Sequence, residues 1–137
     1  MPVEYLGLGD FLLIAEAVLD VPAEVLALTT NLNLADSALH APAASFGGLE
    51  LYRSFPEKAA VLCSRLCNNH PLIDGNKRVA YEALREFVAR NNLPWTNPVD
   101  DGPDGDETVK IMLGLAAGLV TETELTAWID ERLGGAG

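Results

Sequence analysis

The strongest constraint on the fold is a pair of amphipathic stretches on either side of a short polar loop. In the first stretch, apolar residues recur at intervals of three and four, the spacing of one helix face: Ala59, Leu62, Cys63, Leu66 and Cys67. The second stretch, from about Asn76 to Asn92, carries the stripe Ala80, Ala83, Leu84, Phe87 and Val88. Two such helices joined by residues 70–75 should pack as an antiparallel hairpin, with the loop at one end of a bundle.

Start and stop signals predict further helices before this pair. Asp10 can cap a helix beginning at Phe11, which is apolar on nearly all sides through Leu19 and should therefore be largely buried. Short helices are expected at 22–28 and 32–39, and Pro56 suits the first turn of the first amphipathic helix.

Two more helices are expected after the pair. Glu107 to Gly118 should form an apolar helix in which Gly114 and Gly118 let a neighbour approach closely. A capping box of Thr121 and Glu124 should begin the last helix. Useful strand alternation is absent from the sequence, so the predicted class is all-α.

The stretch from residue 40 to residue 51 interrupts the helical pattern at Pro42 and at the pair Gly47–Gly48. It predicts an exposed loop or a small hairpin near residues 44–51. Phe46 beside two glycines suits a flap over a site and, equally, a simple hydrophobic anchor.

Length and composition favour one cooperative domain over residues 1–137, with residues 134–137 as a frayed tail. The formal charge of -11 argues against nucleic-acid or anionic-membrane binding and is compatible with a basic partner or with a solubilising acidic surface. Cys63 and Cys67 share a helix face and are expected as buried free thiols. The longest apolar run, residues 111–120, is too short to span a bilayer, so a soluble cytoplasmic protein is expected.

The acidic loop between residues 94 and 106 suggests calcium at first sight, but the EF-hand spacing with its closing glutamate is absent. We therefore expect no metal site among these aspartates: Asp100, Asp101, Asp104 and Asp106.

The loop between the two amphipathic helices concentrates chemistry. Residues 70–78 contain an imidazole, a carboxylate, an amide and two cations beside a helix start, which attracts phosphate through its free N–H groups. Extending the first apolar stripe by one step aims His70 toward the buried side, where an imidazole can act as a base. The alternative is a plain turn with a helix cap, followed by solvent-facing Lys77 and Arg78.

The stretch His70-Pro-Leu-Ile-Asp-Gly-Asn-Lys-Arg78 closely resembles the signature of the Fic/Doc superfamily, whose Doc branch reads His-x-Phe-x-Asp/Asn-Ala/Gly-Asn-Lys-Arg. The resemblance extends from about Leu8 to Leu133. It implies a Fic/Doc-like helical bundle with the motif loop between two central antiparallel helices. It also implies a flap, or target-positioning hairpin, at Phe46, Gly47 and Gly48.

Most members of this superfamily transfer AMP, but Lys77 and Tyr81 occupy positions where those enzymes have glycine and a second arginine. Both residues look like the Doc branch, the toxins of toxin–antitoxin pairs. The resemblance then implies a kinase that uses ATP and Mg²⁺, places the γ-phosphate on a threonine of elongation factor Tu and so blocks translation. It also implies inhibition by a separate Phd-like antitoxin, because the family's self-inhibitory helix motif is missing.

Carried over residue by residue, the resemblance makes His70 the general base and Asp74 the Mg²⁺ ligand. Gly75 would admit close approach of phosphate, which Asn76, Lys77 and Arg78 would contact.

Two residues depart from the family pattern. Leu72 replaces the phenylalanine that anchors the loop, and Glu82 stands where some Doc proteins have an asparagine, so its carboxylate would repel phosphate or pair with Arg78. Two alternatives to the kinase therefore stay open: an AMP transferase, and a catalytically weakened module that only binds an antitoxin.

Overall fold

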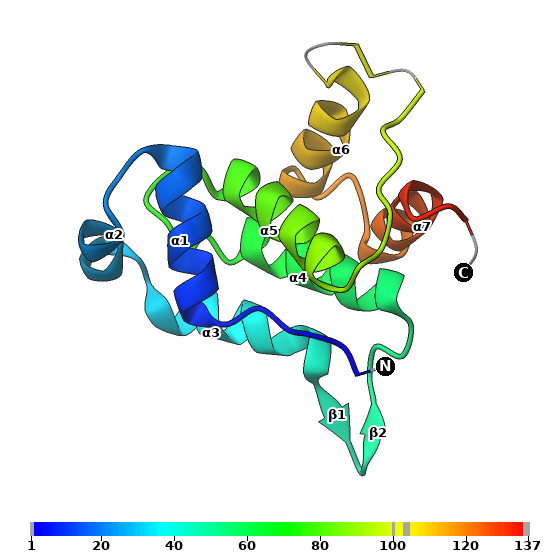
Figure 1. Ribbon diagram of the computed structural model, residues 1–137, viewed down its shortest axis with the longest axis horizontal. Coiled ribbons are helices and arrows are strands. Elements are labelled where there is room, and N and C mark those ends of the chain that lie inside the picture. The colour runs from blue at the N-terminus through cyan, green and yellow to red at the C-terminus, as the bar shows by residue number, and fades with distance from the viewer. Residues whose placement is uncertain (1, 100, 103–104, 136–137) are drawn as a thin grey trace.

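The computed structural model describes residues 2–99, 101–102 and 105–135. Over these residues the chain forms seven α-helices, one 3₁₀ turn and one two-stranded hairpin (Figure 1). In chain order they are α1 Leu8–Leu19, α2 Ala23–Thr29, α3 Leu32–His40, η1 Ala41–Ala43, β1 Ser45–Phe46, β2 Leu49–Glu50, α4 Phe55–Asn68, α5 Asn76–Arg90, α6 Asp106–Ala116 and α7 Glu122–Arg132. The all-α class with one small hairpin is confirmed.

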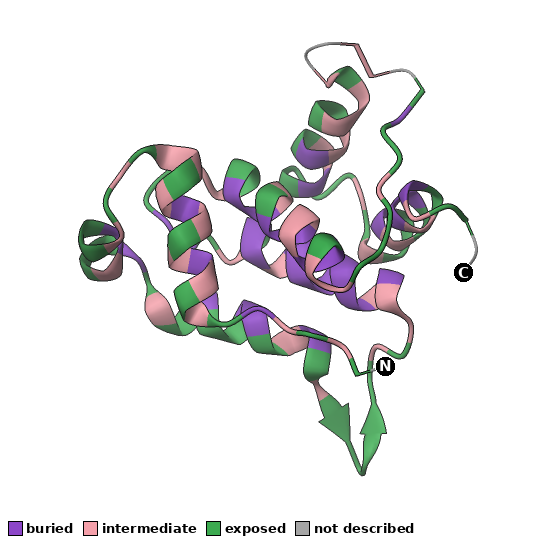
Figure 2. Ribbon diagram, in the orientation of Figure 1, coloured by how far each residue is buried: buried purple, intermediate pink, exposed green. Residues whose placement is uncertain are grey.

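The antiparallel pair α4 and α5 forms the centre of the bundle, as Figure 2 shows by its concentration of buried residues. Helix α4 also packs against α3, α6 and α7, so it is enclosed on most sides. Its start is fixed by a capping box that the sequence analysis missed: the Ser54 hydroxyl accepts the N–H of Glu57, and the Glu57 carboxylate accepts from Ser54. The α4–α5 turn therefore joins two helices with extensive buried faces.

Helix α1 corrects two expectations. It begins at Leu8 with Gly7 as the N-cap, and Asp10 lies in the first turn, where its carboxylate accepts the Gly7 N–H at 2.8 Å. The helix is also less buried than expected, because it lies on the outside of the bundle and only one of its faces is covered (Figure 1). Phe11 and Ala15 are buried, whereas Leu13 is 62% exposed.

Asp10 predicts a measurable pH dependence of stability. The N–H of Gly7, and the Arg90 guanidinium at 3.0 Å, hold the pKa of Asp10 below its ordinary value of 3.8. Because the folded state favours the ionised carboxylate, Asp10 stabilises the fold at pH values above 3.8. This stabilisation is lost as the pH falls below 3.8 and the carboxylate is protonated. Asp10→Asn should lower the free energy of unfolding by about 1 kcal/mol at pH 7.

Urea denaturation of parent and Asp10→Asn at pH 7 and pH 3 checks this, with a difference that shrinks at the lower pH. Glu82→Gln, at an exposed carboxylate outside the ion pairs of the described residues, is the control. A difference for Asp10→Asn that stays constant across this range would contradict the assignment.

The C-terminal helices follow the predicted pattern with one exception. Thr121 and Glu124 form the expected capping box. A side chain at Gly114 would meet Val120 at 2.7 Å, so this glycine does permit close approach. Gly118 does not have that role: it follows the end of α6 with φ +76° and has open space around its Cα.

The hairpin pairs Phe46 with Leu49 across a turn made by Gly47 and Gly48, whose φ values of +59° and +82° suit a two-residue hairpin loop. All four strand residues are exposed, so burial of side chains does not hold the hairpin. The hairpin is held instead by the buried Lys58 of α4. Its Nζ donates to the Glu50 carboxylate at 3.0 Å and to a backbone carbonyl of η1.

The two cysteines are buried free thiols, as predicted. Burial raises the pKa of the Cys63 thiol, which keeps it protonated and unreactive. Among the described helices, none has the length and apolar character needed to cross a bilayer.

Candidate active site

The α4–α5 loop is closed by its own backbone contacts. The Asn76 side chain accepts the Leu72 N–H and donates to the Leu72 carbonyl, both at 3.0 Å. Leu72 is only 5% exposed, so it anchors the loop in the core as the motif's phenylalanine was expected to do. Because both ends of the Asn76 amide are engaged, its side chain shapes the loop, and its backbone N–H is left to face a ligand.

Gly75 fits its position for two independent reasons. Its φ of +82° lies in the left-handed region that other residues adopt at a cost. An added Cβ would also lie 2.3 Å from Cδ2 of Leu19 in α1. Helix α1 therefore packs directly against the motif loop, and a side chain at position 75 would force the Leu19 side chain to move.

His70 is exposed, which corrects the expectation that it points toward the buried side. Helix α4 ends at Asn68, and His70 has φ +50°, so the chain has left the helix before the imidazole is reached. Extending the helical stripe past Cys67 was the error. The left-handed residue is itself unusual for a non-glycine position and marks a constrained loop.

The start of α5 carries backbone N–H groups that no described residue accepts. Gly75 is the N-cap and has no side chain to offer, while its own N–H donates to Asp74 at 2.8 Å. The first helical bond is from Val79 to the Gly75 carbonyl, which leaves the N–H groups of Asn76, Lys77 and Arg78 open. Together with the positive end of the helix dipole, these groups give the start of α5 a positive electrostatic character that suits an anion.

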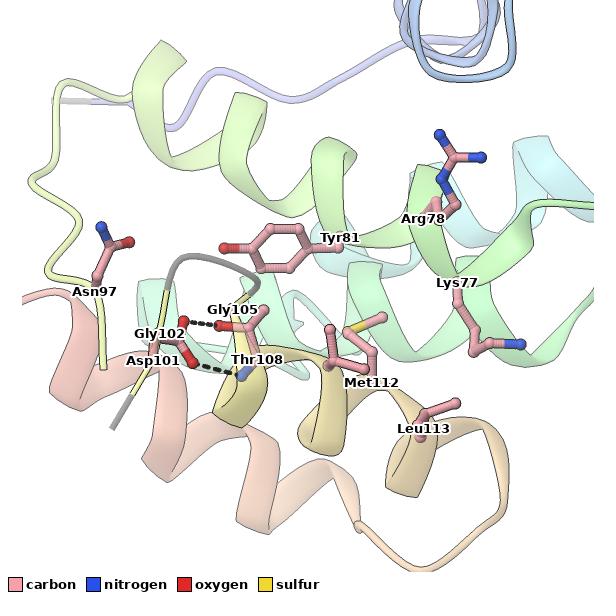
Figure 3. Close-up of a pocket in the computed structure, with 11 residues that line it drawn as sticks. Lys77, Arg78, Tyr81, Asn97, Asp101, Gly102, Gly105, Thr108, Met112 and Leu113 are labelled. Carbon is pink, nitrogen blue, oxygen red and sulfur yellow. Dashed lines mark hydrogen bonds between the residues drawn. The ribbon is translucent and has the colours of Figure 1, made fainter. Parts of the chain in front are cut away.

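A cavity of about 480 Å³ opens beside this helix start, lined by residues of α5 and α6 and by residues 97, 101, 102 and 105 (Figure 3). Lys77 and Arg78 line one end, and Tyr81 lies between them and the polar residues at the other. The remaining lining residues are Asn97, Asp101, Gly102, Gly105, Thr108, Val109, Met112 and Leu113. We call this the first cavity.

The contribution of α6 to the first cavity was not predicted. Thr108 and Met112 are four apart and share a helix face, a spacing that the sequence shows but that alone names no partner. Asp101 caps α6 by accepting the N–H groups of Glu107 and Thr108. Among the residues that the structure describes, no group of three or more acidic, histidine or cysteine side chains lies close enough together to hold a metal. Asp100 and Asp104 lie outside the described residues.

A second cavity, of about 420 Å³, lies against the motif loop and the α1–α2 corner. It is lined by Leu19, Val21, Val25, Leu26, Thr29, Leu72, Ile73, Asp74 and Arg78. Arg78 lines both cavities, and its guanidinium donates to the Val18 carbonyl at 3.0 Å. The site residues predicted from the motif are thus divided: Lys77 lines the first cavity, Asp74 the second, and His70 neither.

The structure does not place the hairpin over the motif loop. Glu50 contacts Lys58 in the first turns of α4, whereas the motif loop follows the other end of that helix. The 14 residues of α4 span about 21 Å. Figure 1 shows the hairpin projecting away from the α4–α5 connection. A role for Phe46, Gly47 and Gly48 in positioning a target stays a prediction.

The fold and loop define a helical domain in which the start of α5, with its open N–H groups, adjoins two cavities. Residues 9–88 match the family model described as Fic/DOC family, which covers more than half of the chain. The chain belongs to the Fic/DOC family. It is 40% identical over 60 residues to Toxin Doc of Mycolicibacterium smegmatis (strain ATCC 700084 / mc(2)155). The matched stretch covers 44% of this chain and 46% of that relative, less than half of either. The family predicted from residues 70–78 is confirmed.

Proposed function

We propose that this protein is a Doc-like toxin that transfers the γ-phosphate of ATP to a protein hydroxyl. The observation that carries the proposal is the open N-terminus of α5, which lies within the family motif and adjoins a cavity large enough for a nucleotide. Likeness to Toxin Doc supports the toxin role.

The first cavity suits the nucleotide. Its cationic end, with Lys77 and Arg78, adjoins the open N–H groups, and both features attract phosphate oxygens. Its middle is apolar, with Tyr81 and Met112, which suits a base. Lys77 is exposed, and a flexible ammonium group can follow the charge that develops on the transferred phosphate.

Asp74 fits the role of Mg²⁺ ligand. Its side chain is exposed at the loop, and one oxygen accepts the Gly75 N–H, which orients the carboxylate. Mg²⁺ is commonly held by one or two carboxylates together with substrate phosphates and water, so a single protein carboxylate is a suitable donor set. When bound, the ion would neutralise phosphate charge.

His70 would act as the general base. The acceptor hydroxyl gives its proton to the imidazole while its oxygen forms a bond to the γ-phosphorus. The bond between that phosphorus and the bridging oxygen breaks, and ADP leaves with the bonding electrons. The open N–H groups at Asn76, Lys77 and Arg78 stabilise the charge on the phosphate oxygens in the transition state.

The proposed acceptor is a threonine of elongation factor Tu, and the consequence is a block of translation in the cytoplasm. The proposed inhibitor is a Phd-like antitoxin whose C-terminal segment folds on the toxin. An acidic chain with a net charge of -11 is suited to protein partners more than to nucleic acid or anionic membranes.

Intact mass spectrometry tests the reaction. The protein is incubated with ATP, Mg²⁺ and elongation factor Tu, and a phosphate-sized increase in the mass of the factor is expected. An AMP-sized increase would establish the alternative, an AMP transferase, which Tyr81 disfavours because it replaces the second arginine of those enzymes. An unchanged mass would contradict both.

The third alternative, a module that only binds an antitoxin, is less well supported by the structure. Leu72 is buried and anchors the loop. Among the described residues Glu82 forms no ion pair with Arg78, whose guanidinium contacts Val18 instead, and Glu82 lines neither cavity. The two departures from the motif therefore leave the loop intact.

Lys77→Gln should raise the KM for ATP or lower kcat, with a combined loss in kcat/KM of about 10- to 100-fold, because a charged phosphate contact is removed. Steady-state phosphorylation at varied ATP concentration measures both constants. Lys110→Gln, at an exposed lysine of α6 outside the first cavity, is the matched control and should behave like the parent. Equal loss in both variants would argue against a phosphate contact at Lys77.

A further inference from the structure

The second cavity differs in chemistry from the first. Apart from Thr29, Asp74 and Arg78, its lining is apolar: Leu19, Val21, Val25, Leu26, Leu72 and Ile73. We propose that this cavity receives an apolar side chain of the acceptor protein, from a segment that also carries a basic residue. This inference rests on the proposed function, because it names how the acceptor of that reaction is held.

The motif loop itself presents apolar surface at this cavity. Ile73, directly before Asp74, is 83% exposed, while Leu26 and Leu72 beneath it are each only 5% exposed. A branched apolar side chain in a loop of polar, chemistry-bearing residues gains stability when a partner removes it from water. The cavity thus has a buried apolar floor and an exposed apolar wall.

The nucleotide is a poor occupant of this cavity. Lys77 does not line it, whereas Lys77 and Arg78 both line the first cavity, so phosphate oxygens meet two cations there and one here. With the nucleotide in the first cavity, the acceptor can approach from the other side, and Arg78 lies between the two. The transferred phosphate would then be reached from both sides, as an in-line transfer requires.

The wall of the cavity is fixed to the loop by hydrogen bonds. The Arg78 guanidinium donates to the Val18 carbonyl at 3.0 Å, and the Asn31 N–H donates to the Pro71 carbonyl at 2.8 Å. A side chain seated between α2 and the loop is therefore held at a defined distance from the motif. Such fixed placement is what converts binding into correct orientation of a reacting hydroxyl.

The charges around the cavity indicate a basic neighbour for the apolar side chain. Asp20 and Glu24 adjoin lining residues of α1 and α2 in sequence, and both are exposed, as is Asp74. With Asp74 assigned to Mg²⁺, Asp20 and Glu24 remain as the carboxylates beside the lining, and Arg78 is the cation within it. A lysine or arginine in the docked segment would complement this rim, in keeping with the net charge of -11 for the whole chain.

Substitutions on α2 test the inference at a distance from the motif. Val25 lines the cavity and is 45% exposed, whereas Leu28, on the same helix, is 87% exposed and does not line it. Val25→Trp should fill the cavity and raise the KM for elongation factor Tu by about tenfold, with kcat and the KM for ATP within about twofold of the parent. Leu28→Trp should leave all three constants unchanged.

A second variant guards against misfolding. Val25→Gln keeps a side chain of moderate size at a half-exposed helix position and should raise the acceptor KM by about threefold. Circular dichroism and thermal unfolding of each variant confirm the fold. Parent-like acceptor KM in both Val25 variants would overturn the inference. So would an equal rise in Leu28→Trp, or a rise in the KM for ATP in place of the acceptor KM.

Failure of the proposed function gives a different result. If the parent protein does not phosphorylate elongation factor Tu but does arrest growth on expression, the target is another protein. Growth curves then test the docking inference. Val25→Trp should relieve the arrest, and Leu28→Trp should arrest growth as the parent does. Equal arrest by all three would overturn the docking inference. A parent that neither labels the factor nor arrests growth would refute the proposed function, and this inference with it.

Discussion

His70→Ala should reduce phosphate transfer by about 10²- to 10⁴-fold and abolish growth arrest on expression, because a positioned general base contributes that much to proton transfer. The substitution should leave stability almost unchanged, since the imidazole is exposed. Rates from single-turnover phosphorylation, together with growth curves, measure the effect. An exposed histidine held at φ +50° is oriented by the loop backbone, and the side chain itself adds little packing.

The chain offers a matched control, because it has only two histidines. His40 is also exposed and lies at the end of α3, where its Nδ1 is 2.9 Å from the Asp36 carbonyl oxygen. His40→Ala should retain parental activity and toxicity. A His70→Ala variant as toxic as the parent would refute the catalytic role and favour the binding-only alternative.

Gly75→Ala should lower the free energy of unfolding by about 2–4 kcal/mol, which combines the cost of a left-handed alanine with that of crowding Leu19. Phosphate transfer should fall as well, because the same glycine sets the start of α5 and its open N–H groups. Urea denaturation measures the first effect and the phosphorylation assay the second.

Gly48→Ala separates the two causes. Gly48 has the same φ of +82° but nothing within 4 Å of an added Cβ, so this variant carries only the conformational cost of about 1 kcal/mol. The crowding is tested by Leu19→Ala, in whose background Gly75→Ala should cost less than in the parent. Equal costs for Gly75→Ala and Gly48→Ala would show that Leu19 does not constrain the loop.

Much of the fold was predictable because helix caps, prolines and turn glycines agreed with the spacing of the apolar residues. The stripe from Ala59 to Cys67 and the stripe from Ala80 to Val88 predicted α4 and α5, and the structure buries both. Turn chemistry at Gly47 and Gly48 predicted an exposed loop or a small hairpin, and the structure has the hairpin. These features depend on neighbours in the chain, which the sequence contains in full.

The errors arose where tertiary contacts decide. The all-round apolar pattern of α1 did not reveal that only one of its faces would be covered, and Leu13 is left exposed. The helical period was extended past the end of α4 at Asn68 to His70, whose left-handed backbone lies outside the helix. In both cases the spacing of apolar residues along the chain was used to predict burial, which depends on contacts with other parts of the fold.

Residues 70–78 alone predict an imidazole, a carboxylate and two cations beside a helix start, and they identified the family that the match over residues 9–88 confirms. Tertiary structure alone decided how those residues are shared between two cavities. Thr108 and Met112 come from α6, and Val25 comes from α2, so each wall is built from residues far apart in the chain. Packing of α1 and α6 against α5 brings them together, and no local pattern encodes that packing.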